Sequence, residues 1–146
     1  GDVHTRAHFY RALVEGLIYG LRAGKEQIER RLGHPLTVVR VSGGGAQSDA
    51  ILQITADILG QPVERPVVTE TSALGAAINL AVGLGVYRDT ASAVAAMTRV
   101  GQRFLPDPAP QAQYDALYRQ VYRPLYGRLR PLYHRIREIT GYPALD

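Results

Sequence analysis

Residues 36–59 read LTVVRVSGGGAQSDAILQITADIL, and they contain the signals of a strand, a glycine turn and a helix in succession. The first six residues, 36–41, are rich in β-branched side chains with almost no polar alternation, which is typical of a short buried strand. Three glycines, Gly43, Gly44 and Gly45, follow. Asp49 then starts an amphipathic segment that Gly60 and Pro62 close, so we predict a helix there.

The glycine turn is the candidate binding site of this sequence. Glycine adopts φ > 0 readily and lets a flat or charged ligand approach the main chain without meeting a Cβ. The helix start next to it adds unpaired N–H groups and a partial positive charge, which favour a nucleotide. From the residues alone, a tight strand-to-helix turn without a ligand remains an equal alternative.

Two familiar nucleotide-binding patterns are absent from the glycine turn. A dinucleotide fold requires G-x-G-x-x-G, but Ser48 stands at the third glycine position. A P-loop requires a lysine after its last glycine, and none follows Gly45. Any nucleotide site here therefore belongs to another class.

Length and composition indicate a single α/β domain. The chain has 146 residues, of which 46% are hydrophobic, so it is long enough to bury a core. It has no cysteine and no apolar run long enough to cross a bilayer, so we expect a soluble, cytoplasmic protein without disulfides or a signal peptide. The net charge of +4 comes from dispersed arginines, which argues against nucleic acid as a partner.

The N-terminal part predicts a long helix over residues 6–32, closed by Gly33 and Pro35. Large apolar residues recur at helical spacing, and we expect them to be buried: Phe9, Leu13, Leu17, Leu21, Ile28 and Leu32, widened by Val14 and Ile18. Small residues repeat every four positions on another side: Ala12, Gly16, Gly20 and Gly24. Because glycine weakens a helix, this ladder predicts a closely packed neighbour.

Residues 63–82 repeat the order of strand and helix. Residues 63–68 resemble a strand, and residues 69–72 all carry acceptors that are able to cap a helix start. The following run Ala73-Leu74-Gly75-Ala76-Ala77 is helical in composition but almost without bulk. We expect this helix to pack closely beside the glycine turn.

The C-terminal third predicts a short helix capped by Thr90, an extended stretch over 99–105, a breaker at 106–110 and a helical tail over 111–140. One apolar stripe runs along the tail, so we expect the tail to wrap around the body, kinked at Pro124 and Pro131. Four tyrosines recur every four residues: Tyr114, Tyr118, Tyr122 and Tyr126. We favour edge packing with the hydroxyls in water over stacking on nucleobases.

Several motifs in this order resemble the C-terminal domain of the FGGY family of carbohydrate kinases, which includes glycerol kinase, xylulokinase and ribulokinase. The resemblance covers nearly the whole chain. It rests on the run from Ser42 to Ala46 and on these later residues: Gln53, Ala56-Asp57, Leu59-Gly60, Pro62-Val63, Glu70 and Ala73-Leu74-Gly75-Ala76-Ala77. The helix that carries Arg11-Ala12, Glu15-Gly16 and Gly20-Leu21 also looks like the family helix before the glycine strand.

This resemblance implies part of an actin-like ATPase (ribonuclease H-like) domain, helix-rich, with a long kinked C-terminal helix. It implies that ATP or ADP binds at the glycine turn, with these residues beside the adenine and ribose: Gly43, Gly44, Gly45, Ala46, Ser48 and Asp49. Asp49 falls where some members present an asparagine, so one hydrogen-bond donor is lost at that position.

The resemblance also implies what this chain lacks. The aspartate base, the sugar contacts and the phosphate loops of the family belong to earlier parts of the protein, so we assign no catalytic or metal-binding residue here. We expect a fragment that is inactive alone, within a parent that uses ATP and Mg²⁺ to phosphorylate a sugar, ketose or polyol. Two alternatives stay open: a packing or oligomerisation module, including a homodimer, and an actin-like ATPase without a sugar substrate.

Overall fold

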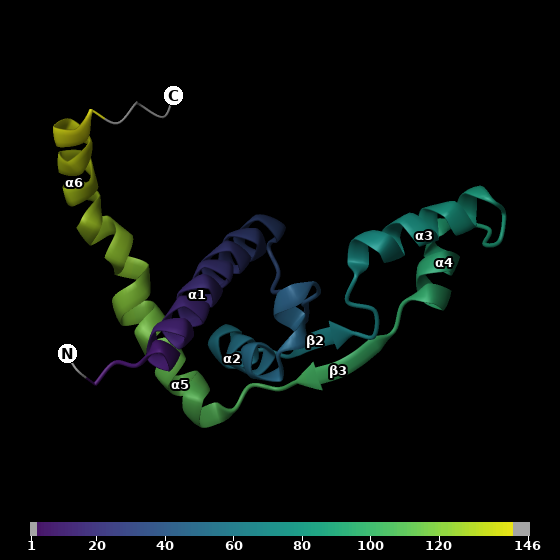
Figure 1. Ribbon diagram of the computed structural model, residues 1–146, viewed down its shortest axis with the longest axis horizontal. Coiled ribbons are helices and arrows are strands. Elements are labelled where there is room, and N and C mark those ends of the chain that lie inside the picture. The colour runs from purple at the N-terminus through teal and green to yellow at the C-terminus, as the bar shows by residue number, and fades with distance from the viewer. Residues whose placement is uncertain (1–2, 142–146) are drawn as a thin grey trace.

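Helix α2 lies at the centre of the structure, between a long helix on one side and a small sheet on the other (Figure 1). The computed structural model describes residues 3–141. Its elements follow one another in this order: α1 (Arg6–Leu32), β1 (Val39–Arg40), the 3₁₀ turn η1 (Gly44–Gln47), α2 (Asp49–Leu59), β2 (Val63–Pro66), α3 (Thr71–Gly83), α4 (Thr90–Met97), β3 (Val100–Phe104), α5 (Pro108–Leu117), the π-helical turn η2 (Tyr118–Tyr122) and α6 (Arg123–Thr140).

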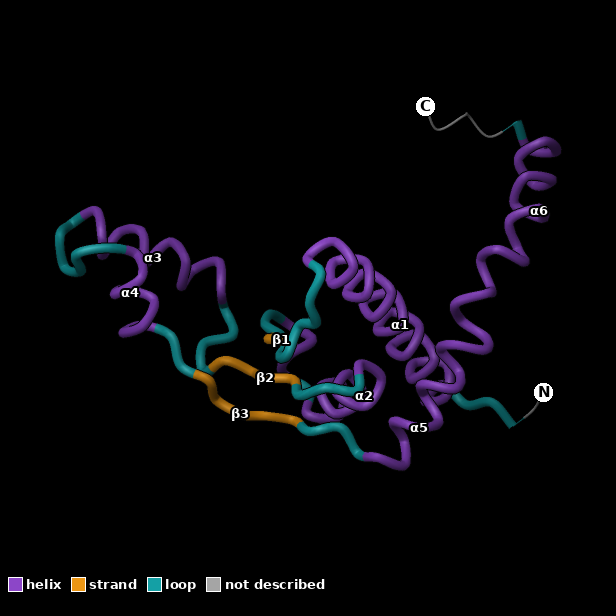
Figure 2. Tube along the Cα trace, turned by 180° about the vertical axis from the view of Figure 1, so that it is seen from behind, coloured by secondary structure: helices purple, strands orange, loops and turns teal. Residues whose placement is uncertain are grey.

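The sheet has the order β1-β2-β3, with β1 parallel and β3 antiparallel to β2 (Figure 2). Val63 lies opposite Val39 on one side and Phe104 on the other. Both predicted strands are shorter than expected, since β1 covers two residues of 36–41 and β2 ends at Pro66. Proline has no N–H for the ladder, and the register of β2 against β3 shifts between Arg65 and Pro66.

Helix α2 contributes to both buried clusters of the core. Ile58 packs with residues of α1 and the C-terminal helices: Ile18, Tyr19, Tyr114 and Tyr118. Leu52 and Ala56 pack with Val63 and Phe104 of the sheet. The predicted helix over 49–59 is therefore confirmed, and it joins the sheet layer to the helical layer.

The predicted bounds of α1 are confirmed, but the predicted buried face is correct only at Val14 and Ile18. Gly33 ends the helix in the left-handed conformation at φ +75°, and its N–H bonds the carbonyl of Glu29. The buried residues of α1 are Ile18 and Tyr19, whereas the six large residues of the main stripe are exposed: Phe9, Leu13, Leu17, Leu21, Ile28 and Leu32. Two sides of this helix are apolar, and the described chain covers one of them.

The predicted close packing along the glycine ladder of α1 is found at one position. A Cβ on Gly20 would lie 3.5 Å from the hydroxyl of Tyr122, an ordinary contact. A Cβ on Gly16 or Gly24 would meet no described atom within 4 Å. The ladder therefore does not mark a continuous helix contact within residues 3–141.

The C-terminal region departs from its prediction in two ways. The expected breaker is the start of α5, because Asp107 caps the helix through the N–H of Ala109 and Pro108 occupies the first turn, where no N–H is needed. Helix α6 also does not wrap around the body, since it extends away from it and buries none of its residues (Figures 1 and 2). The π-helical turn η2 precedes Pro124, while Pro131 is accommodated inside α6.

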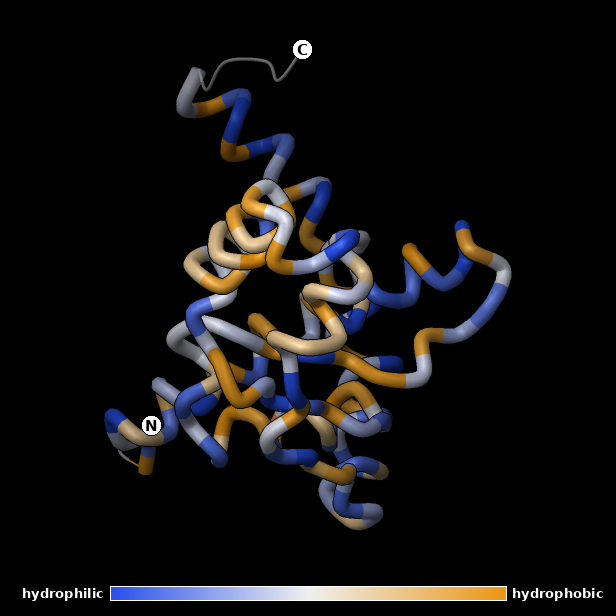
Figure 3. Tube along the Cα trace, turned by 90° about the vertical axis from the view of Figure 1, so that its right-hand side faces the viewer, coloured by the Kyte–Doolittle hydropathy of each residue, from blue (hydrophilic) through white to orange (hydrophobic). Residues whose placement is uncertain are grey.

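The apolar stripe of α6 is exposed to solvent in this chain. Hydrophobic and hydrophilic positions alternate along the helix toward its C-terminal end (Figure 3). Leu132, Ile136 and Ile139 are each more than half exposed. The described body offers this face no partner.

The tyrosine ladder packs into the core at its first two positions. Tyr114 and Tyr118 are buried beside Tyr19, which supports the packing interpretation. The hydroxyl of Tyr114 does not face water, because it donates to Glu15 Oε1 at 2.7 Å. Tyr126 at the far end is largely exposed.

The predicted short helix is present as α4, but it begins one residue earlier than expected, because its cap is Asp89 rather than Thr90. The Asp89 carboxylate accepts the N–H of Ser92 at 2.8 Å. The predicted extended stretch over 99–105 is confirmed as β3. No helix within the described part of the chain is both long and apolar enough to cross a lipid bilayer.

Candidate functional site

The glycine corner, residues 43–45, joins β1 to α2. Gly43 has φ +81° and ψ −165°, a conformation that side-chain-bearing residues rarely adopt. Its N–H donates to the carbonyl of Thr69 at 3.1 Å, and its own carbonyl accepts the N–H of Ala46 at 3.1 Å. The predicted turn thus consists of Gly43, with its positive φ, followed by the short 3₁₀ turn η1.

The glycine corner is open on its outer side. A Cβ built on Gly43, Gly44 or Gly45 would meet no described atom within 4 Å. Gly44 and Gly45 are exposed. A ligand is therefore able to approach the main chain here without displacing a side chain of residues 3–141.

A hollow of about 520 Å³ lies next to the glycine corner. Its lining comes from the turn after the corner, from the sheet and from the segment after β2: Gln47, Arg65, Pro66, Val67, Thr69, Gly101 and Gln102. The hollow is largely open to solvent and has polar groups from three separate segments, and none of the six predicted site residues lines it.

The other three predicted site residues serve the local structure in this chain. The side chain of Ala46 is fully buried. Ser48 caps α2, because its hydroxyl accepts the N–H of Ile51 at 3.4 Å. Asp49 forms an ion pair with Arg65, with 2.7 Å between Oδ1 and Nη1, while most of its side chain stays exposed.

Arg65 is the residue of this site that the sequence interpretation missed. Besides Asp49, its guanidinium donates to the carbonyl of Ala46 at 3.1 Å and to Oε1 of Gln102. It also lies over the ring of Phe104, 5.6 Å from the centroid. The available signal was the charged pair Glu64-Arg65 in a predicted strand whose other residues are valine and proline, shortly after the predicted helix of the site.

The second small-residue helix approaches the glycine corner only at its start. The hydroxyls of Ser42 and Thr71 lie 3.3 Å apart, and Glu70 precedes α3 without a side-chain cap. The remainder of α3 leads away from the corner and pairs with α4 (Figure 1). The expectation that residues 70–77 pack beneath the corner is therefore wrong beyond the first turn.

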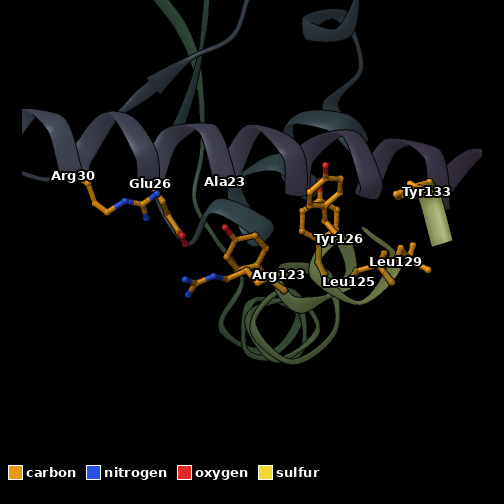
Figure 4. A pocket seen from close by; sticks show the side chains of 10 residues that line it. Ala23, Glu26, Arg30, Arg123, Leu125, Tyr126, Leu129 and Tyr133 are labelled. Carbon is orange, nitrogen blue, oxygen red and sulfur yellow. The ribbon is translucent and has the colours of Figure 1, made fainter. Parts of the chain in front are cut away.

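A second hollow, of about 420 Å³, lies between α1 and the C-terminal helices (Figure 4). Glu26 and Arg30 reach it from α1, and Arg123, Tyr126 and Leu129 reach it from the opposite side. None of the six predicted site residues lines it. Among residues 3–141, no group of three or more His, Asp or Glu side chains is arranged to hold a metal ion.

Comparisons with known proteins identify the family of this chain. Residues 1–84 match the C-terminal domain of the FGGY family of carbohydrate kinases. The chain is 36% identical over 119 residues to the uncharacterised sugar kinase YgcE of Escherichia coli K12, covering 82% of this chain and 24% of that protein. It is 39% identical over 119 residues to glycerol kinase of Dechloromonas aromatica, covering 82% and 23%.

A solved structure agrees with this assignment. The crystal structure of xylulose kinase from Rhodospirillum rubrum superimposes with a TM-score of 0.73 at 35% identity, covering 92% of this chain and 27% of that one. The chain thus spans about a quarter of the length of its relatives and has part of their actin-like ATPase fold. It belongs to the FGGY family of carbohydrate kinases, and residues 1–84 match the C-terminal domain of that family.

Proposed function

We propose that this chain is the nucleotide-binding part of an ATP-dependent kinase that phosphorylates a hydroxyl group of a sugar, ketose or polyol. The observation that carries the proposal is the open glycine corner. It combines accessible main chain at residues 43–45, an adjacent hollow and the start of α2. Such a combination accommodates a flat base and a ribose without a steric clash.

Each predicted residue has a part in this proposal. The glycines give the nucleoside access to the main chain, and the buried Ala46 anchors the turn against the core. Ser48 keeps the start of α2 in place. Asp49, held at one carboxylate oxygen by Arg65, lies at the edge of the corner, where it is able to accept a hydrogen bond from the nucleoside.

The remaining parts of the reaction lie outside this chain in our proposal. Phosphoryl transfer needs a base for the attacking hydroxyl, several phosphate-binding groups and a divalent cation that neutralises charge on the phosphates. We therefore propose that Mg²⁺, the sugar and the catalytic base are held by the rest of a longer, cytoplasmic kinase. The isolated chain should show no turnover.

The proposal is tested by measuring binding and activity of the full-length protein. Calorimetric titration should detect binding of ATP and ADP, and a coupled assay of ADP release should show activity with at least one member of a panel of ketoses and polyols. ADP release that does not depend on any of these acceptors would instead favour an ATPase without a sugar substrate. Absence of nucleotide binding would contradict the proposal.

The exposed face of α1 favours a second candidate, a packing or oligomerisation module. Six large apolar residues of this helix are at least half exposed, which is unusual for a surface without a partner. This alternative predicts self-association, including a homodimer, without any nucleotide binding. Sedimentation analysis alongside the titration separates the two candidates.

A further inference from the structure

Arg65 connects three separate segments around the glycine corner. One nitrogen of its guanidinium, Nη1, donates both to the carbonyl of Ala46 at 3.1 Å and to Oδ1 of Asp49 at 2.7 Å. The other, Nη2, donates to Oε1 of Gln102 on β3. A single side chain of β2 therefore joins the last part of the turn, the first residue of α2 and the neighbouring strand.

The glycine corner has few other contacts that fix its conformation. Its three glycines bring no side chains, and a Cβ at any of them would meet no described atom within 4 Å. Glycine also has the largest conformational freedom of any residue. The hydrogen bonds of Gly43, the buried side chain of Ala46 and the bond from Arg65 to the Ala46 carbonyl thus hold the turn in one arrangement before a ligand arrives.

The chemistry of Arg65 suits this role better than that of another cation. A guanidinium is planar and presents five donors in fixed directions, whereas an ammonium is a compact charge that does not keep this geometry. The side chain is 21% exposed and lies over the ring of Phe104. Its partner Asp49 is 65% exposed, so water screens this ion pair more than it screens the bond to the Ala46 carbonyl.

We infer that Arg65 is a positioning residue for the nucleoside part of ATP, acting through the Ala46 carbonyl and the Asp49 carboxylate. The inference rests on the proposed function. A preorganised turn avoids the entropy loss of ordering on binding, so the loss of Arg65 weakens nucleotide affinity without touching the groups that transfer the phosphoryl group. Arg65 therefore affects the KM for ATP more than kcat.

The test compares Arg65→Gln, Arg65→Lys and Asp49→Asn in the full-length protein. Arg65→Gln should raise the Kd for ATP and for ADP by about tenfold or more, while kcat at saturating ATP and the KM for the sugar stay within about twofold. Arg65→Lys should recover part of the affinity through its remaining charge. Asp49→Asn with Arg65→Gln should be less than additive, because both changes remove the same ion pair.

Arg103→Gln is the matched control. Arg103 lies on β3 next to Gln102 but faces Glu64, with 3.8 Å between its Nε and Oε1 of that residue. This variant should bind ATP as the unchanged protein does. Melting curves without nucleotide separate a positioning effect from general unfolding, and Asp49→Asn tests the same contact in a variant of nearly unchanged shape.

Two results would overturn the inference while the proposed function stands. The first is an unchanged affinity for ATP in Arg65→Gln. The second is a fall in kcat with no change in the affinity for ATP. Failure of the unchanged protein to bind ATP or ADP would overturn the proposed function, and this inference with it.

Discussion

Tyr19 and Tyr114 are neighbours in the core, with ring centroids 6.3 Å apart, but their hydroxyl groups have different surroundings. The hydroxyl of Tyr114 donates to Glu15 and accepts from Arg11. The hydroxyl of Tyr19 is buried and has no hydrogen-bond partner among the described residues. An unpaired buried hydroxyl costs free energy, whereas a paired one is close to neutral or favourable.

The substitutions Tyr19→Phe and Tyr114→Phe should therefore change stability in opposite directions. Tyr19→Phe removes an unpaired hydroxyl and should raise the free energy of unfolding by up to about 1 kcal/mol. Tyr114→Phe removes the bonds of the Tyr114 hydroxyl, while Glu15 and Arg11 stay paired with each other, so it should lower the free energy of unfolding by about 0.5 to 1.5 kcal/mol. Urea unfolding of the full-length protein measures both changes in the free energy of unfolding. An equal loss of stability in the two variants would contradict the different surroundings of the two hydroxyl groups.

The same environment predicts a loss of stability in alkaline solution. Burial, with a contribution from the Glu15 charge, raises the pKa of Tyr19 from 10.0 to about 12. Burial followed by the bond to Glu15 also raises the pKa of Tyr114. The folded state thus favours the neutral form of Tyr19, whereas the unfolded chain loses the proton near pH 10. The free energy of unfolding is therefore unaffected by this group below pH 10 and falls as the pH rises from 10 toward 12.

Unfolding midpoints measured between pH 8 and pH 12 test this expectation. The unchanged protein should lose stability over the upper part of this range, and Tyr19→Phe should lose less of it. If the unfolding midpoint of Tyr19→Phe fell with pH as steeply as that of the unchanged protein, the raised pKa of Tyr19 would be contradicted.

Helix α2 connects the two layers of the fold, because it contributes residues to both buried clusters. It is also joined to α5 by a buried polar contact. The carboxylate of Asp57 accepts the N–H of Asp107 at 2.8 Å and the amide of Gln53 at 2.9 Å, with the Asp57 side chain almost fully buried. This contact fixes where the chain turns from the sheet into the C-terminal helices.

Asp57→Ala should accordingly destabilise the protein by about 1 to 3 kcal/mol, because it leaves the Asp107 N–H unpaired, whereas the Gln53 amide keeps its bond to the Leu105 carbonyl. Asp57→Asn is the matched control, since its side-chain carbonyl is still able to accept the Asp107 N–H. Chemical unfolding should rank the unchanged protein first, Asp57→Asn second and Asp57→Ala last. An Asp57→Ala variant as stable as the unchanged protein would contradict the role of this contact.

The elements were predictable where local chemistry determines them. Gly33 and Pro35 end α1, and α2 starts at Asp49 and ends before Gly60, as the sequence predicts. Residues 106–110 misled the prediction because proline stops a helix in its interior but suits its first turn. The glycine corner was visible as a short local pattern, whereas the bonds of Arg65 join residues 16, 19 and 37 positions apart.

We relate the exposed apolar face of α1 to the short length of this chain compared with its relatives. Leu13 and Leu17 are 67% and 74% exposed, and the chain spans about a quarter of the length of its relatives. Helix α1 has two apolar sides, and its sequence alone does not show which side packs against the described chain and which would pack against polypeptide outside it. In a longer kinase, as proposed above, we expect the remaining polypeptide to cover this face.

Leu17→Asp in the full-length protein tests that expectation. If Leu17 is covered there, the change buries an unpaired charge and should lower the free energy of unfolding by at least about 2 kcal/mol. Gln27→Asp, at an exposed polar position of the same helix, should change it by less than about 0.5 kcal/mol. A Leu17→Asp variant as stable as Gln27→Asp would mean that the face stays open to solvent.

Gly45→Val fills the open glycine corner without disturbing the fold. A Cβ at Gly45 meets no described atom within 4 Å, and the residue does not need a positive φ, so the valine should be tolerated. Gly127→Val, at an equally open glycine of α6, is the matched control.

The decisive measurement is the KM for ATP of Gly45→Val in the full-length protein, with the sugar at saturation. We predict a rise of at least about tenfold, with an unchanged melting temperature and an unchanged KM for the sugar, because the side chain occupies the space of the nucleoside. Gly127→Val should keep the original value. An unchanged KM for ATP in Gly45→Val would contradict the assignment of the nucleotide to this corner.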